Sequence, residues 1–165
     1  MASTVTASTL TVSLTESVTL KGQELGATNT FTVANVNEVY KRIVTCLASV
    51  DTTIVHFNTQ VDVEDSGIDT QDAKYIRVTN LDDTNSVNLN LQIDVTESGS
   101  GVAEPNETAT ILLAAGETFV MGTPHDSLAV YDTDSSVQTT LHDLESILID
   151  PGANAVDIEV FVASA

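Results

Sequence analysis

The sequence predicts an all-β fold, an antiparallel β-sandwich or a jelly-roll-like barrel in a single domain. The 165 residues include 24 Thr and 21 Val, and β-branched side chains fit a pleated sheet better than a helix. Apolar and polar residues alternate over many short segments, which is typical of strands with one buried face. The length suits one domain, and no shift in composition marks a second.

The first predicted strand lies near the N-terminus. Leu10, Val12 and Leu14 share one face of residues 9–15, and hydroxyl-bearing residues occupy the other face. We expect this strand to pair within the protein's own sheet. The same alternation predicts a second strand at residues 30–33.

The N-terminal end also suits an arm. Residues 1–20 carry a single ionised side chain, Glu16. An extended segment of this kind can add a strand to a neighbouring subunit, because its backbone donors and acceptors supply the affinity. We therefore treat residues 1–15 as an N-terminal extended arm or first strand, and residues 16–165 as the β-sandwich domain. For residues 1–8, both the arm and a free end remain open.

The segment 36–48 fits two structures. Its apolar residues follow the i, i+3, i+4 spacing of a helix, and Asn35 with Glu38 fits an N-cap and its partner. However, the sequence RIVTCL is rich in β-branched residues and precedes another strand-like run. We favour a strand over residues 39–47.

The clearest alternation covers residues 86–95. Its inward-facing positions are Val87, Leu89, Leu91, Ile93 and Val95. The tail repeats the pattern at Val156, Ile158, Val160 and Val162. Further strands are predicted at residues 53–57, 74–79, 108–114, 117–121, 127–131 and 145–149.

The connections between these strands contain turn-forming residues. Residues 80–85 are expected to close a hairpin between strands 74–79 and 86–95, because Asn and Asp tolerate turn conformations. Ala115 and Gly116 separate two short strands. Residues 97–107 are expected to form a mobile surface loop.

The charge balance excludes two classes of partner. The chain has 24 Asp and Glu against 5 Lys and Arg, a formal net charge of −19. A nucleic acid or an anionic membrane would be repelled, and no apolar run approaches the ~20 residues that span a bilayer. All five cations lie in the first 77 residues. Such an acidic surface suits high ionic strength, where screening reduces self-repulsion.

No pattern in the sequence indicates catalysis or a cofactor. His56 lies in an apolar strand, where a buried or half-buried imidazole is expected, while His125 and His142 occupy polar segments without a nucleophile signature. Cys46 is expected to be a small core residue. Glycine-rich phosphate loops and zinc-ligand spacings are absent. We predict no catalytic residue, no cofactor and no enzyme activity.

A calcium loop deserves comparison with a plain acidic loop. Residues 62–72 place several carboxylates around Gly67, but the position of the bidentate Glu in an EF-hand falls on Ala73. Asp132 and Asp134 form a poorer candidate. We favour solvated acidic loops and predict no metal site.

Few residues are candidates for contact with a partner. The cations Lys41, Arg42, Lys74 and Arg77 lie in predicted strands with apolar neighbours. They are expected to pair with nearby carboxylates or, alternatively, to contact an acidic partner. The predicted partner contacts are Leu10, Val12, Leu14, Lys41, Arg42, Lys74 and Arg77.

Three blocks of the sequence carry a resemblance. They are KYIRVTNLDDTN at residues 74–85, LLAAGETFV at residues 112–120 and AVDIEVFVA at residues 155–163. These blocks resemble small all-β virion structural proteins of tailed bacteriophages, particularly marine ones. The resemblance implies a non-enzymatic particle component located in the virion and made in the host cytoplasm.

Within that group, the expected role is a capsid decoration or cement protein. Its partners would be the major capsid protein or another virion protein, and a homo-oligomer is expected, with a trimer as the predicted state. A phage tail or fibre component is an alternative. A calcium-dependent extracellular adhesin or carbohydrate-binding β-sandwich, using residues 62–72, is a further alternative from a different class.

Overall fold

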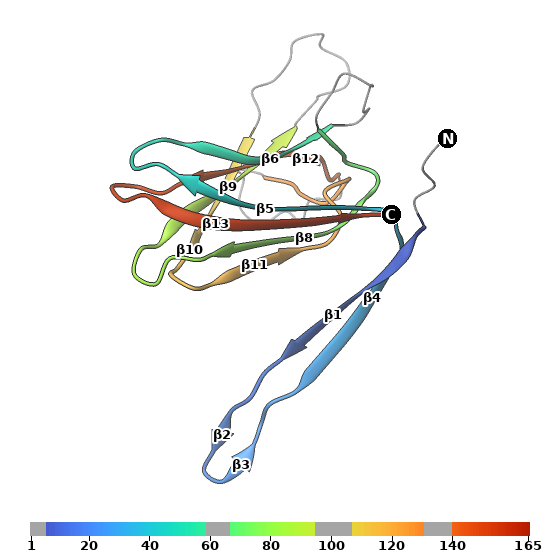
Figure 1. Cartoon of the computed structure of the whole chain (residues 1–165), viewed down its shortest axis with the longest axis vertical. Helices are drawn as coiled ribbons and strands as arrows, with labels where there is room; N and C mark the ends of the chain where they lie inside the picture. The colour runs from blue at the N-terminus through green and yellow to red at the C-terminus, as the bar shows by residue number, and fades with distance from the viewer. Residues whose placement is uncertain (1–5, 59–66, 95–106, 131–139) are drawn as a thin grey trace.

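The fold is built entirely from strands in the part of the chain that is described. The computed structural model describes residues 6–58, 67–94, 107–130 and 140–165. All of the regular secondary structure in these ranges is β-strand, which confirms the all-β prediction. Two sheets pack face to face as a β-sandwich, and a hairpin projects from them (Figure 1). The sheets do not close into a barrel.

The larger sheet, here called the β9 sheet, contains five strands. In spatial order they are β10 (Glu107–Leu113), β9 (Val87–Asp94), β12 (Asp143–Asp150), β6 (Thr52–Asn58) and β7 (Ile68–Asp69). Neighbouring strands are antiparallel, except that the short β7 pairs parallel to β6.

The second sheet, here called the β13 sheet, contains four antiparallel strands. In spatial order they are β11 (Thr118–Met121), β8 (Ala73–Asn80), β13 (Val156–Ser164) and β5 (Glu38–Cys46). The two longest pairings join the central strand β13 to β5 and to β8. The outer face of this sheet carries the projecting hairpin (Figure 1).

The core lies between the inner faces of the two sheets. Alternation places Leu89 and Leu91 of β9 in one buried cluster with Ile158 and Val160 of β13. Because every second residue points inward, the strands supply an apolar layer without a long hydrophobic run. Cys46 is fully buried in this layer, which confirms its predicted core role.

The hairpin is formed by the N-terminal strands. Strand β1 (Ser8–Thr15) pairs antiparallel with β4 (Thr28–Val36), and the tip contains β2 (Thr19–Leu20) and β3 (Gln23–Glu24). Figure 1 shows this hairpin extending away from the sandwich. We call residues 8–36 the arm. The expected division at residue 15 therefore falls inside the arm, between β1 and β2.

Three local predictions can be compared with the structure. The segment 36–48 forms the strand β5 and not a helix, as favoured. The predicted hairpin across residues 80–85 is wrong, because β8 and β9 belong to different sheets. The predicted strand at residues 127–131 is also wrong over residues 127–130, where a single isolated bridge joins Leu128 to His142.

Several predictions fall at least partly outside the described residues. They concern the N-terminal five residues of the arm prediction, most of the loop at 97–107, the inward position of Val95, and residue 131 of the strand predicted at 127–131. The acidic segment 62–72 is described only from residue 67 onward, and Asp132 and Asp134 lie outside the description.

Candidate functional site

The arm has two chemically different faces. Leu10 pairs with Val33 and Val12 pairs with Phe31, so these side chains share one face. The opposite face carries hydroxyl groups, and two cross-strand pairs there are hydrogen-bonded. Ser13 Oγ lies 3.1 Å from Thr30 Oγ1, and the hydroxyl oxygens of Thr15 and Thr28 are 3.2 Å apart. We call these the apolar face and the hydroxyl face.

The base of the arm packs on the outer face of the β13 sheet. Val36 of β4, Tyr75 of β8 and Ala163 of β13 are buried together there. The partly buried side chains packed against them are Leu10, Val12, Val33, Phe161 and Ala165. This second apolar cluster is separate from the core, and it fixes the point from which the arm projects.

Aromatic rings continue this contact between arm and sheet. The ring of Tyr75 lies 5.9 Å from that of Phe31 and 6.0 Å from that of Phe161, centroid to centroid. Both distances are within the range of favourable aromatic pairs. The buried Tyr75 ring therefore lies between the arm and the sheet, and burial also raises the pKa of its hydroxyl.

The tip of the arm is ordered by one carboxylate. Glu24 accepts hydrogen bonds from the N–H groups of Gly26 at 2.9 Å and Val18 at 3.2 Å, and from the Thr19 hydroxyl at 3.0 Å. These bonds, with that from Gly26 first, lower the pKa of Glu24. Lys21 and Gly22 form the turn, and both have positive φ values, 52° and 81°.

A charge network occupies the outer face of the β13 sheet next to the arm. Glu159 of β13 binds the Lys41 Nζ at 3.1 Å and also pairs with the Arg77 guanidinium. Hydrogen bonds from Arg77 and then Lys41 lower the pKa of Glu159. The Arg77 guanidinium also lies 6.0 Å above the Phe161 ring, within cation–π distance.

The seven predicted contact residues separate into groups. Leu10 and Val12 lie at the packed base of the arm, while Leu14 is exposed farther along the same face. Lys41 and Arg77 meet at Glu159, which matches the expected pairing with carboxylates.

The other two cations lie apart from this network. Arg42 is exposed on the edge strand β5. Lys74, near the start of β8, donates a hydrogen bond to the backbone carbonyl of Gln71. The three apolar residues predicted to contact a partner thus lie together on the arm. Of the four predicted cations, only Lys41 and Arg77 lie together, on the β13 sheet.

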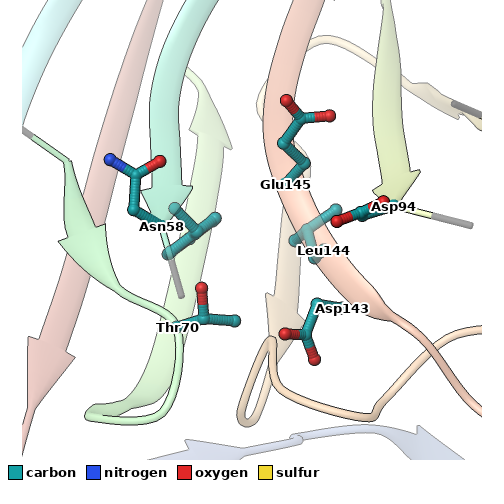
Figure 2. Close-up of a pocket in the computed structure, with 7 residues that line it drawn as sticks. Asn58, Thr70, Asp94, Asp143, Leu144 and Glu145 are labelled. Carbon is teal, nitrogen blue, oxygen red and sulfur yellow. The ribbon is translucent and has the colours of Figure 1, made fainter. Parts of the chain in front are cut away.

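A small pocket lies at one end of the β9 sheet. Its volume is about 190 Å³, and Figure 2 shows Asn58 and Thr70 facing Asp94, Asp143 and Glu145 across it. Asn58 and Thr70 come from the β6–β7 side, and the carboxylates come from β9 and β12. The pocket is polar, and three of its lining residues are acidic.

One group of side chains beside this pocket has the composition of a metal site. Ligand atoms of His125, Asp126 and Asp143 lie within 4.8 Å of one another. Asp143 Oδ1 already lies 2.8 Å from His125 Nδ1 and accepts a hydrogen bond from the Asp126 N–H at 2.7 Å. These contacts anchor the loop that holds His125 and Asp126 to β12. They are sufficient to explain why the three side chains lie together.

The remaining histidines and the cysteine occupy different environments. The His56 side chain is 49% exposed, which is the half-buried case of the expectation, and it points away from the core while the next residue, Phe57, is buried. The backbone of His142 bridges to Leu128. Burial raises the pKa of the Cys46 thiol, which leaves it in the unreactive neutral form.

An extended N-terminal arm or first strand was predicted for residues 1–15, but not the projecting hairpin that residues 8–36 form (Figure 1). The turn pair Lys21-Gly22 and the alternation over residues 28–36 could have indicated it, because together they complete a hairpin with residues 8–15. The alternation alone does not distinguish a hairpin that stands apart from a strand that joins the main sheet.

Comparisons with known proteins identify no relative. The chain matches no family model, no curated protein and no solved structure. Among the described residues, no helix has the length and apolar character needed to cross a membrane.

Proposed function

We propose that this chain is a non-enzymatic virion structural protein that decorates the outer surface of a phage head. In this role it binds the major capsid protein or another virion protein and reinforces the contacts between shell subunits. The sequence blocks at 74–85, 112–120 and 155–163 support the proposal through their resemblance to bacteriophage virion proteins. They form parts of β8, β10, β11 and β13 and the loops beside them.

The projecting arm is the observation that carries the proposal. A protein that joins neighbours needs a surface that can be buried against them, and the arm presents an apolar face outside the sandwich. Contiguous exposed apolar surface of this kind marks interaction sites in soluble proteins. The sandwich itself supplies a rigid base, because its core is packed from both sheets.

The charge distribution fits a position on the outside of a particle. Residues 37–165 contain 22 acidic and 4 basic residues, a net charge of −18. An outer surface with this charge does not adsorb polyanions.

A homotrimer seated on a local symmetry axis is the assembly we propose, since most soluble oligomers are symmetric.

The test is quantitative mass spectrometry of purified virions of the phage that encodes the chain. We expect the chain at a fixed, high ratio to the major capsid protein, and we expect it to be missing from particles made without its gene. Its absence from purified particles that assemble in cells where it is abundant would exclude the proposal.

A further inference from the structure

We propose that the apolar face of the arm binds the same face of the arm in a second copy of this chain. The inference deepens the proposed function, because it assigns the contact that holds the homo-oligomer together. It rests on the exposure of the arm, its ordered shape and its charge.

The distal half of the apolar face is exposed. Only the base of the arm is covered by the β13 sheet, whereas several large side chains beyond it are about half exposed. They are Leu14 at 61%, Val18 at 51%, Leu20 at 57% and Leu25 at 57%. Together they offer on the order of 400 Å² of apolar surface, as much as the largest patch of an ordinary monomer.

The strand pairing of the arm keeps one register from its middle to its tip, although regular strand is interrupted at residues 16–18 and 25–27. Leu14 pairs with Asn29, and Leu20 pairs with Gln23. Between these pairs, the Leu25 N–H donates to the Val18 carbonyl at 2.9 Å. Alternation within β1 places Leu14 on the apolar face, and Val18, Leu20 and Leu25 extend the exposed apolar surface from there to the tip.

The arm is already ordered without a partner. The Glu24 carboxylate satisfies backbone N–H groups at the tip, and the Glu16 N–H donates to the Ala27 carbonyl at 2.8 Å. A binding element that is fixed before association loses less conformational entropy when it binds. A two-stranded hairpin is only marginally stable alone, so contact with a partner would stabilise it further.

Charge favours another arm as the partner. The first 36 residues contain one Lys and two Glu, a net charge of −1, whereas the remaining residues carry −18. Two sandwiches repel each other, but two arms approach with almost no electrostatic cost. The arm also lacks the charges needed to bind a strongly charged surface.

The second arm matches the first in shape and polarity. Two flat ribbons with apolar faces can stack about 10 Å apart, with their hydroxyl faces toward solvent. The outer face of the β13 sheet is a poorer partner, because the base of its own arm and the Lys41–Glu159–Arg77 network occupy it. Two faces remove on the order of 800 Å² from solvent, and three arms around an axis remove more, near the ~1,200 Å² of specific interfaces.

The first experiment measures the mass of the purified full chain in solution. We expect a mass of two or three times 17.4 kDa by light scattering, falling to one chain on dilution. The variant Leu14→Glu should weaken association at least tenfold, which corresponds to the loss of one buried Leu. Thr15→Glu adds the same charge to the hydroxyl face and should leave the mass unchanged.

A second variant guards against misfolding of Leu14→Glu. Leu20→Glu lies at the tip, far from the sandwich, and should weaken association while the melting temperature of the sandwich stays within a few degrees. A chain that is monomeric at its highest soluble concentration would overturn the proposal. An oligomer that neither variant weakens would also overturn it.

Cross-linking identifies the contacting faces. Leu14→Cys should form cross-linked dimers with a short bis-maleimide, whereas the adjacent Thr15→Cys should not; the native Cys46 is buried. Equal cross-linking of both variants would contradict an interface on the apolar face. These experiments use the chain without virions, so they test this inference separately from the proposed function. A monomeric chain that still coats particles would refute this inference alone. An oligomeric chain that is absent from particles would refute only the proposed function.

Discussion

Asn80 connects three segments of the sandwich through a single buried side chain. Its amide nitrogen donates to the carbonyls of Asn85 at 2.8 Å, Leu113 at 3.3 Å and Ala114 at 3.1 Å. Its side-chain oxygen accepts from the Asp82 N–H at 3.0 Å. The loop after β8 therefore crosses from one sheet to the other with its backbone groups satisfied.

We expect Asn80→Ala to destabilise the fold by about 3 kcal/mol, because it leaves buried carbonyls without a donor. Chemical denaturation measures the free energy of unfolding. Asn154→Ala is the matched control, since Asn154 binds Asn85 in the same loop from the exposed side, and its cost should stay within about 0.5 kcal/mol. Equal effects of the two variants would contradict the role assigned to Asn80.

Glu159 gives the outer face of the β13 sheet a pH dependence. Its pKa is lowered in the folded state by hydrogen bonds from Arg77 and Lys41. The group therefore contributes stability above its unfolded pKa of about 4.3, and this contribution disappears as the pH falls through the lower folded value.

The variant Glu159→Gln tests this dependence. We expect it to lower the free energy of unfolding by about 1 kcal/mol at pH 7. The difference from wild type should vanish in acid, once the pH falls below the lowered folded pKa of Glu159. Denaturation curves at several pH values measure this difference. A difference that grows in acid would contradict the direction of the pKa shift.

Some of the side-chain contacts could be predicted from the sequence, and others could not. The pairing of Lys41 and Arg77 with carboxylates was predictable, because five cations among 24 acids find partners easily. The burial of Asn80 was not, because two of its three partner carbonyls lie more than 30 residues away, in β10 and the turn after it. Local sequence contains no information about that approach.

At the scale of elements, alternation located the strands well. Residues 86–95 and the tail from Val156 to Val162 were predicted with the correct inward positions wherever the structure describes them. The two-residue strands β2, β3 and β7 were missed, since two residues are too short for any periodicity.

The pairing of strands was harder to predict than their position. A six-residue connection between β8 and β9 suits a hairpin, yet it joins two sheets here. Alternation states which face of a strand is buried, and that face is buried equally well in either arrangement. The pairing of β1 with β4 in a separate hairpin escaped prediction for the same reason.

Gly26 fixes the geometry of the arm. A Cβ atom at this position would lie 2.2 Å from the backbone oxygen of Glu16, so the strands would have to separate. We expect Gly26→Ala to increase amide hydrogen exchange throughout residues 8–36 and to leave the sandwich unchanged. Gly122→Ala, where nothing lies within 4 Å of the added Cβ, is the control. Unchanged exchange in the arm would contradict this constraint.

At the scale of the whole molecule, the net charge of −19 opposes compaction. Added salt screens this repulsion, since the Debye length falls from ~30 Å at 0.01 M to ~3 Å at 1 M. We expect the melting temperature to rise by several degrees between 0.01 and 0.5 M NaCl, measured by calorimetry. A decrease in melting temperature would show that ion pairs, and not self-repulsion, dominate the electrostatics.

The composition was sufficient to predict the class of the fold, whereas the choice between sandwich and barrel required the structure. β-Branched residues and alternation are common to both architectures. What separates them is whether the edge strands pair with each other, and β5 and β11 remain edges in the β13 sheet. Edge pairing depends on distant segments that no local pattern encodes.

We propose that this chain strengthens a particle by joining its neighbours. The most direct measurement is the temperature at which virions release their genome, compared between particles that carry the chain and particles made without its gene. We expect release at a lower temperature without the chain, and we expect purified chain to restore the original value. Identical release temperatures would contradict a reinforcing role.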